Sequence, residues 1–339
     1  FLFSSIYHPR LPKSVPVFSK NDKVPCVSQL SRHRVIHINA CTPIILQQVL
    51  MSITSLETCN TSFAFLLCFY TYQLSARHQG YTFRKLALQV GYFDGDKHGR
   101  DNFNASGKSS GTLIWSLART AIARTGMQIF LSFQPNQSPV EVLGNLSWCI
   151  WAFLNITFYS VTLDFWYYLV HRAAHEVPIL WKFHRTHHTT KHPNIRLTAY
   201  ADTEQEVWDM VGAPILAYAT LRVLNIPFDF FMLWICLHYI VYTEVSGHSA
   251  VRILMFPPLT LSPLLAHFDA ELSIEDHDLH HRHGWRVSKN YGKQTRVWDR
   301  LFGTCSQRLE SNALNIDYEN RIVITFVSIL RTNIFNLLP

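Results

Sequence analysis

Long stretches without charge alternate with short polar segments along this chain. A membrane helix needs about 18 or more residues with few charges, and the stretches at 35–56, 58–76 and 142–163 meet that length. The last stretch is the strongest, because no charged residue lies between Glu141 and Asp164. The pattern therefore predicts an all-α membrane protein with a bundle of transmembrane helices.

The other apolar stretches are shorter or interrupted. Residues 210–221 and 230–243 predict either a hairpin that enters the membrane and returns or two short spans. Residues 253–268 contain three prolines, which favours an interfacial segment over a regular helix. Residues 77–111 are polar and predict a water-exposed loop, and residues 322–339 predict an apolar tail helix.

Composition agrees with a membrane protein. Hydrophobic residues make up 48% of the 339 residues and charged residues only 16%, against roughly 25% charged residues in soluble proteins. The net charge is +7, but no nucleic-acid module accompanies it, so an anionic membrane surface is the expected partner of the basic residues. The seven cysteines form no CxxC pair, and we expect no disulfide framework.

Histidines are the unusual feature of the composition. Three clusters stand out, one with the spacing HxxxH and two with the spacing HxxHH. Residues three and four positions apart share a helix face, so each cluster directs two or three imidazoles toward one point. The clustered residues are His171 and His175, then His184, His187 and His188, then His277, His280 and His281.

These clusters lie beside apolar stretches, so all three can meet at one membrane–water boundary. Burying so many ionisable rings is costly unless something binds them, and we interpret the clusters as metal ligands. Eight imidazoles exceed what one metal can bind, which indicates two ions; imidazole suits iron, zinc, copper and nickel, so the spacing leaves the metal open. The isolated histidines His8, His33, His37, His78 and His98 are expected to be ordinary buried or surface residues.

The order of the motifs resembles the fatty acid hydroxylase and sterol desaturase superfamily over residues 143–304. This order is HxxxH, HxxHH, one downstream histidine and HxxHH, followed by Asn-Tyr-Gly at 290–292 and a further matching segment at 298–304. The resemblance implies a four-helix membrane bundle with a cytosolic histidine-rich cap that holds two irons. It also implies nine ligands, the eight clustered histidines and His248.

Two positions depart from the family's pattern. Many members carry His or Asn four residues before the single histidine, where this chain has Glu244. Its carboxylate would bind iron directly or orient a water or His248, and we treat Glu244 as the catalytic candidate. Sterol-oxidising members tend to carry a histidine where this chain has Asp202, which weighs against a sterol. His267 and His283 lie near the clusters but fit no motif.

The resemblance implies an enzyme that uses O2 at the two irons to hydroxylate or desaturate a lipid of the sterol, fatty acyl or sphingoid class. Electrons from NAD(P)H would arrive through an external cytochrome b5 or reductase, because the chain has no flavin, nicotinamide or fused haem motif. Lys289, Lys293, Arg296 and Arg300 are candidates for docking this acidic partner. The expected location is the endoplasmic reticulum membrane, with several spans and the histidine motifs facing the cytosol.

Metal-bound imidazoles also need acceptors for their second N–H. Asp164 precedes His171 by seven residues and so shares its helix face, although an interfacial charge would occupy the same position. The carboxylates available for this role are Asp164, Glu176, Asp202, Glu244, Asp276 and Asp299.

Four regions follow from these patterns. Residues 1–40 are basic and predict a disordered arm or a leader, and residues 41–142 hold the first membrane segments and the polar loop. Residues 143–304 are the expected catalytic domain, and residues 305–339 form a tail. Two other classes of function stay open: a histidine-rich metal transporter, and an inactive family member that binds lipid as a scaffold.

Overall fold

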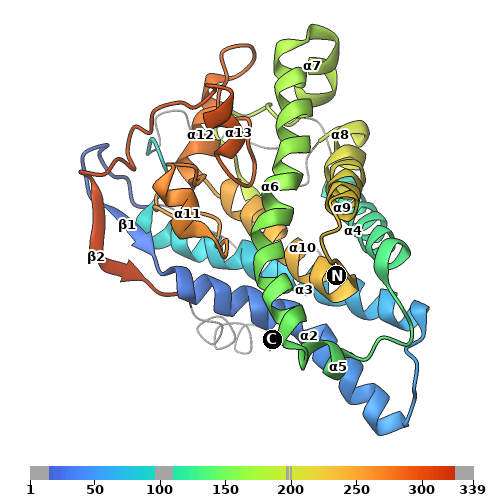
Figure 1. The fold of residues 1–339 in the computed structure, drawn as a ribbon. Helices are drawn as coiled ribbons and strands as arrows, with labels where there is room; N and C mark the ends of the chain where they lie inside the picture. The colour runs from blue at the N-terminus through green and yellow to red at the C-terminus, as the bar shows by residue number, and fades with distance from the viewer. Residues whose placement is uncertain (1–14, 96–109, 196–197, 199–200, 325–339) are drawn as a thin grey trace.

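Helices make up most of this computed structural model, which describes residues 15–95, 110–195, 198 and 201–324 (Figure 1). The longer helices are α2 (Gln29–Thr54), α3 (Thr61–Val90), α4 (Ser110–Ser132), α6 (Leu146–Glu176), α9 (Ala213–Val223) and α10 (Phe230–Gly247). The shorter ones are α5 (Pro139–Leu143), α7 (Pro178–His184), α8 (Thr203–Val207), the π-helical segment η3 (Trp208–Gly212), α11 (Ser262–His267), α12 (Ile274–His283) and α13 (Val297–Leu301). The strands are β1 (Val24–Val27) and β2 (Ile316–Ile322).

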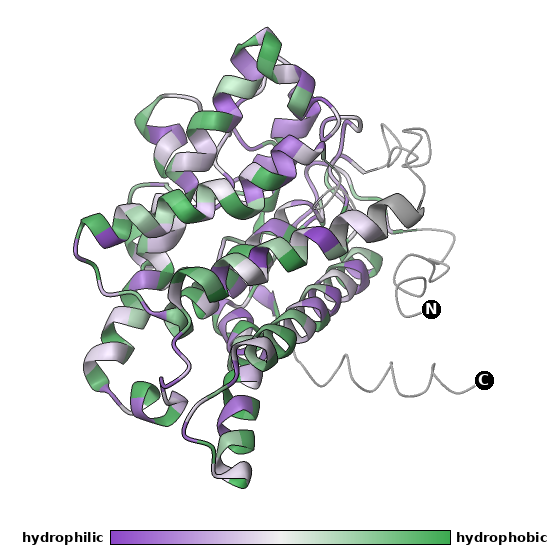
Figure 2. Cartoon of the chain, turned by 90° about the vertical axis from the view of Figure 1, so that its right-hand side faces the viewer, coloured by the Kyte–Doolittle hydropathy of each residue, from purple (hydrophilic) through white to green (hydrophobic). Residues whose placement is uncertain are grey.

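Among the described residues, α2, α6 and α10 are long and apolar enough to cross a membrane. Apolar side chains surround α10, and it lies at the centre, packed against α2, α3 and α6. Hydrophobic residues are spread along the long helices, whereas the loops beside the upper ends of the helices are largely hydrophilic (Figure 2). This distribution agrees with a membrane-embedded bundle that carries a polar cap.

α6 connects the two parts. Asn145 caps its first turn by accepting a hydrogen bond from the backbone N–H of Trp148. The helix has no charged residue before Asp164 and then continues for twelve residues to Glu176. At about 1.5 Å per residue the extension adds roughly 18 Å. The last turns of α6 therefore stand in the polar cap rather than beside the apolar bundle.

The predicted loop at 77–111 is wrong over its first part. α3 continues to Val90, and residues 96–109 lie outside the described residues. Phe83 is fully buried and packs against Tyr242 of α10, with ring centres 5.6 Å apart. Tertiary packing of a few apolar residues extends this helix through a polar stretch.

The short apolar stretches form the helices that were expected near 210–243. Residues 210–221 fall in η3 and α9, and the 11 residues of α9 are too few to span a membrane alone. α10 has 18 residues and is a candidate span, and Asp229 caps it by accepting from the backbone N–H of Met232 at 2.8 Å. Residues 253–268 stay irregular until α11, as their prolines predict.

A two-stranded parallel sheet, which the all-α prediction lacked, joins the two ends of the described chain. Val24 of β1 lies opposite Ile316 of β2. Both strands are short, and each has its partner at the far end of the chain, so neither carries the local signals of a hairpin. All seven cysteines are free, as predicted.

The terminal predictions change accordingly. The arm expected over residues 1–40 is ordered from β1 onward, because β1 and the start of α2 fall within it, while residues 1–14 lie outside the described residues. A tail helix was expected over residues 322–339. Ile322 is instead the last residue of β2, and residues 325–339 lie outside the described residues.

Candidate metal centre

Four elements deliver the clustered histidines to one place in the cap. The last turns of α6 carry the HxxxH motif, and the second motif begins at the end of α7 and continues into the following turn. His248 follows the last residue of α10. α12 carries the third motif, and a capping box between Ser273 and Asp276 fixes its first turn.

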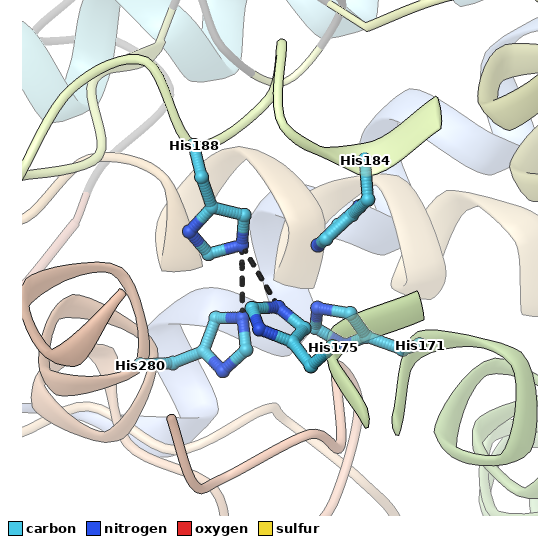
Figure 3. Close-up of side chains that lie close together, drawn as sticks. All are labelled: His171, His175, His184, His188 and His280. Carbon is cyan, nitrogen blue, oxygen red and sulfur yellow. Dashed lines mark hydrogen bonds between the residues drawn. The ribbon is translucent and has the colours of Figure 1, made fainter. Parts of the chain in front are cut away.

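The first group contains five histidines (Figure 3). Nε2 of His188 lies 3.2 Å from Nε2 of His175 and 3.1 Å from Nε2 of His280. The five-histidine group consists of His171, His175, His184, His188 and His280, and one ligand atom from each lies within 4.8 Å of the others.

The second group contains four buried histidines. Nε2 of His248 lies 3.2 Å from Nε2 of His187 and 3.1 Å from Nε2 of His277. The four-histidine group consists of His187, His248, His277 and His281, again within 4.8 Å. The two groups adjoin, because the rings of His188 and His281 stack with centres 4.3 Å apart. The structure thus brings together all nine histidines that the sequence analysis singled out.

Hydrogen bonds orient several of these rings through Nδ1. His171 lies 2.7 Å from the carbonyl oxygen of Tyr291, and His280 lies 2.8 Å from that of Lys289. His248 lies 2.8 Å from the carbonyl oxygen of Glu244, one turn earlier in α10. A carbonyl oxygen only accepts, so each Nδ1 carries the proton and each Nε2 keeps a free lone pair.

Several other ring nitrogens are buried without a partner among the described residues. They include Nε2 of His171, Nε2 of His184 and both ring nitrogens of His281. A buried polar atom without a hydrogen bond costs about 1–3 kcal/mol. Nε2 of His248 and Nε2 of His280 are unprotonated because their Nδ1 atoms donate to carbonyl oxygens. Ring nitrogens that converge at 3.1–3.2 Å fit the donor set of a metal ion, and two groups fit two ions.

Burial also sets the charge of the cap histidines. It lowers the pKa of His248 to about 3, and it lowers the pKa of six others well below the usual value, with neighbouring imidazoles or Lys293 adding to the effect. These six are His184, His187, His188, His277, His280 and His281. Neutral imidazole is the form that binds a metal, so the site is ready for ions near neutral pH.

The sequence of this chain is similar to those of known proteins. The fatty acid hydroxylase family model matches residues 156–304, which include all nine histidines. A protein named fatty acid hydroxylase vlmA, from Lecanicillium sp., is 45% identical over 323 residues, covering 93% of this chain and 88% of its own length. This chain belongs to the fatty acid hydroxylase family. The predicted resemblance is therefore confirmed.

Other relatives share a shorter region with this fatty acid hydroxylase family member. Human alkylglycerol monooxygenase is 30% identical over 156 residues, 44% of this chain and 30% of that protein. The methylsterol monooxygenase erg25B of Aspergillus fumigatus is 29% identical over 159 residues, 46% of this chain and 49% of that protein. No solved structure matches the chain.

The carboxylates expected beside the imidazoles support the family's site from further away. Asp164 accepts from the backbone N–H groups of Lys293 and Gln294 at 2.7 and 2.9 Å. Asp299 accepts from the backbone N–H of Tyr291 at 2.8 Å. Both therefore hold the segment whose Tyr291 carbonyl orients His171. The prediction that Asp164 accepts directly from His171 was wrong, because the acceptor is the backbone carbonyl of Tyr291.

The remaining carboxylates have other partners. Glu176 pairs with Arg172 at 2.7 Å, and Asp202 accepts from the hydroxyl of Thr186 at 2.8 Å. Asp276 belongs to the capping box of α12. One amide was missed by sequence reasoning: Oε1 of Gln205 accepts from Nδ1 of His184 at 3.0 Å. The sequence gives no signal for Gln205, because it lies outside the histidine motifs.

Glu244 belongs to neither histidine group. It is half-buried, accepts from the side chain of Gln294 at 2.8 Å, and lines a cavity together with His187 and His248. Lys293 lines the same cavity, with Nζ 3.0 Å from a carboxylate oxygen of Asp209. Burial opposes the charge on Lys293, but Asp209 and Glu244 raise its pKa above the usual value.

The basic residues proposed for docking are mostly engaged elsewhere. Lys293 and Arg296 are buried, and Arg300 pairs with Asp269. Lys289 stays exposed. Packing of the 290–299 segment against α6 turns these side chains inward, which spacing alone did not reveal. His267 and His283 lie at the ends of α11 and α12, are exposed, and join neither group.

Proposed function

We propose that this chain is a membrane-bound monooxygenase or desaturase that binds two irons in the two histidine groups and uses O2 to modify a lipid. The observation that carries the proposal is the convergence of nine imidazoles, eight of them buried, into a group of five and a group of four. Membership of the fatty acid hydroxylase family supports iron over the other metals that imidazole suits.

The relatives support a lipid as the substrate. The relative that matches over 93% of this chain is named a fatty acid hydroxylase, which favours a fatty acyl chain. The shorter matches are named for alkylglycerols and methylsterols. A sterol is the weaker candidate, since Asp202 stands where a histidine was expected and pairs with Thr186 instead.

The five-histidine group would hold one iron and the four-histidine group the other. When bound, the iron pair would supply the activation of O2 for attack on an unactivated C–H bond. The carbonyls of Tyr291, Glu244 and Lys289 hold the imidazole tautomers with Nε2 free. Glu244 would position a water or a substrate group in the cavity beside His187 and His248.

Other parts of the proposal rest on the family and on the helices. We place the chain in the endoplasmic reticulum membrane with the histidine cap in the cytosol. Electrons would come from NAD(P)H through a separate cytochrome b5 or reductase. A transporter would carry its ligands in the middle of the membrane, whereas these histidines lie on the extension of α6 and in the cap.

One substitution in each group tests the proposal. His280→Ala and His187→Ala are expected to lose bound iron and lipid product while the protein still inserts into the membrane. Iron per chain is measured on protein purified in detergent, and product by lipid profiling of the expressing host. His283→Ala, at the exposed end of the same helix as His280, is the matched control and should keep both. Full iron content and turnover in His280→Ala would refute the site.

The role of Glu244 has its own test. Glu244→Gln is expected to lower product formation while iron content stays at the wild-type level, because the carboxylate lines the cavity without joining either histidine group. Loss of iron in this variant would instead make Glu244 a ligand, and an unchanged rate would make it a packing residue.

A further inference from the structure

An exposed aromatic residue lies above the five-histidine group. Trp285 follows the end of α12 and is 38% exposed. Its ring stacks on that of Trp181 in α7, with centres 5.6 Å apart and planes 13° apart. An exposed tryptophan held in one orientation by a second one is a common anchor for a partner protein.

Trp181, the inner tryptophan, lies beside three of the histidines. The ring centre of Trp181 lies 5.1 Å from that of His175, 5.6 Å from that of His188 and 5.9 Å from that of His184. All three histidines belong to the five-histidine group. Trp285 and Trp181 therefore form a continuous row of aromatic rings from solvent to that group.

Positive charge surrounds the exposed ring. The guanidinium of Arg286 lies 4.4 Å from the ring centre of Trp285. Lys182 and Arg185 are exposed on and just after α7, next to Trp181 and one turn beyond it. In the described part of the chain, no carboxylate forms an ion pair with any of these three. We call Trp285, Trp181, Lys182, Arg185 and Arg286 the tryptophan patch.

The patch stands away from the apolar part of the bundle. Val177, between α6 and α7, follows Asp164 by thirteen residues, which corresponds to roughly 20 Å along α6. Figure 1 shows α7 at the end of α6 opposite to α5. The polar layer of a bilayer is only about 5–8 Å thick on each side. This separation favours an acidic protein over a lipid head group as the occupant.

We propose that the tryptophan patch docks an acidic one-electron donor protein and that the Trp285–Trp181 pair passes its electrons to the iron that the five-histidine group would hold. The inference rests on the proposed function, which requires such electrons. For hydroxylation the balance is C–H + O2 + 2e⁻ + 2H⁺ → C–OH + H2O. Two donor molecules are each oxidised by one electron per turnover, and the two indoles end unchanged. Small interfaces with complementary charge are typical of such encounters.

The charge of the patch is tested with the soluble haem domain of cytochrome b5 as the probe. Lys182→Glu combined with Arg286→Glu is expected to raise the Kd of the probe by about tenfold or more at low salt and to flatten its salt dependence. The measurement uses both metal-free and iron-loaded protein in detergent. Arg321→Glu, an equal reversal at an exposed position in β2, is the control and should keep the wild-type Kd.

The aromatic pair is tested separately by the rate of haem oxidation after mixing reduced probe with iron-loaded protein. Trp285→Leu is expected to slow this rate several-fold at saturating probe, whereas Trp285→Phe keeps a ring and most of the rate. Trp115→Leu, at another exposed tryptophan on α4, is the control. When each protein is reduced by dithionite without O2, freed of excess dithionite and then mixed with O2, all these variants should form product at the wild-type level.

Each outcome decides the proposal. Unchanged Kd in the double charge reversal, or a wild-type rate in Trp285→Leu, would overturn it. So would weaker binding of the double variant to phosphatidylserine vesicles with an unchanged Kd for the probe, because the patch would then face lipid. Absence of product from wild-type protein with dithionite would instead refute the proposed function, and the Kd measured on metal-free protein would still decide docking.

Discussion

In this protein, one hydrogen-bond acceptor at Nδ1 fixes which nitrogen of an imidazole is free to bind a metal. His171, His248 and His280 each donate Nδ1–H to a backbone carbonyl, and His184 donates to Gln205. The spacing of the histidines was sufficient to predict which residues converge. It could not predict the acceptors, because every residue carries a carbonyl and only the fold brings the right one within reach.

Gln205 offers a test at this scale, because it is the side-chain acceptor for His184. Gln205→Leu is expected to weaken iron binding by about 10- to 100-fold, since partners of metal-bound histidines typically contribute that much. Competition with a chelator measures the affinity. Gln205→Glu keeps an acceptor oxygen and should stay near the wild-type value. Equal affinity in all three proteins would show that His184 needs no such partner.

The extension of α6 and the segment after α12 behave as one structural unit. Asp164 binds the backbone of this segment at Lys293 and Gln294, and the hydroxyl of Thr295 at 2.7 Å. A Cβ at Gly292 would lie 2.3 Å from the carbonyl oxygen of Thr295, so the segment closes more tightly than any other residue would allow. Helices were predictable from apolar length, whereas this contact between distant segments was not.

Asp164→Ala is the corresponding prediction for these elements. It leaves several buried N–H and O–H groups without an acceptor, each costing about 1–3 kcal/mol, so thermal stability should fall markedly. Iron content should fall as well, because Tyr291 in the same segment holds His171. Asp164→Asn keeps one acceptor oxygen and should lie between the two. Unaltered melting in Asp164→Ala would mean that the segment is held by other contacts.

Across the whole molecule, the buried histidines link stability to pH. The seven cap histidines outside the candidate membrane helices have pKa values lowered by burial, to about 3 for His248. Unfolded histidine has a pKa of about 6.5. Below that pH the unfolded chain therefore binds more protons at these histidines than the folded chain does. The stability is complete above pH 6.5 and is lost as the pH falls toward the folded-state values.

Metal-free protein in detergent should therefore melt at a lower temperature at pH 5.5 than at pH 7.5. Each histidine that stays neutral contributes about 1.4 kcal/mol between these two pH values, nearly all of it below pH 6.5. Thermal unfolding at both pH values measures the effect, and His281→Leu should reduce the difference. A melting temperature that does not change with pH would mean that these rings are solvated in the metal-free protein.

The sheet between β1 and β2 has a consequence for biosynthesis. Ile316 leaves the ribosome almost three hundred residues after its partner Val24. The membrane helices can insert during translation, but the sheet can form only once β2 has emerged. A nascent chain that stalls before that point would expose the unpaired edge of β1 to other proteins.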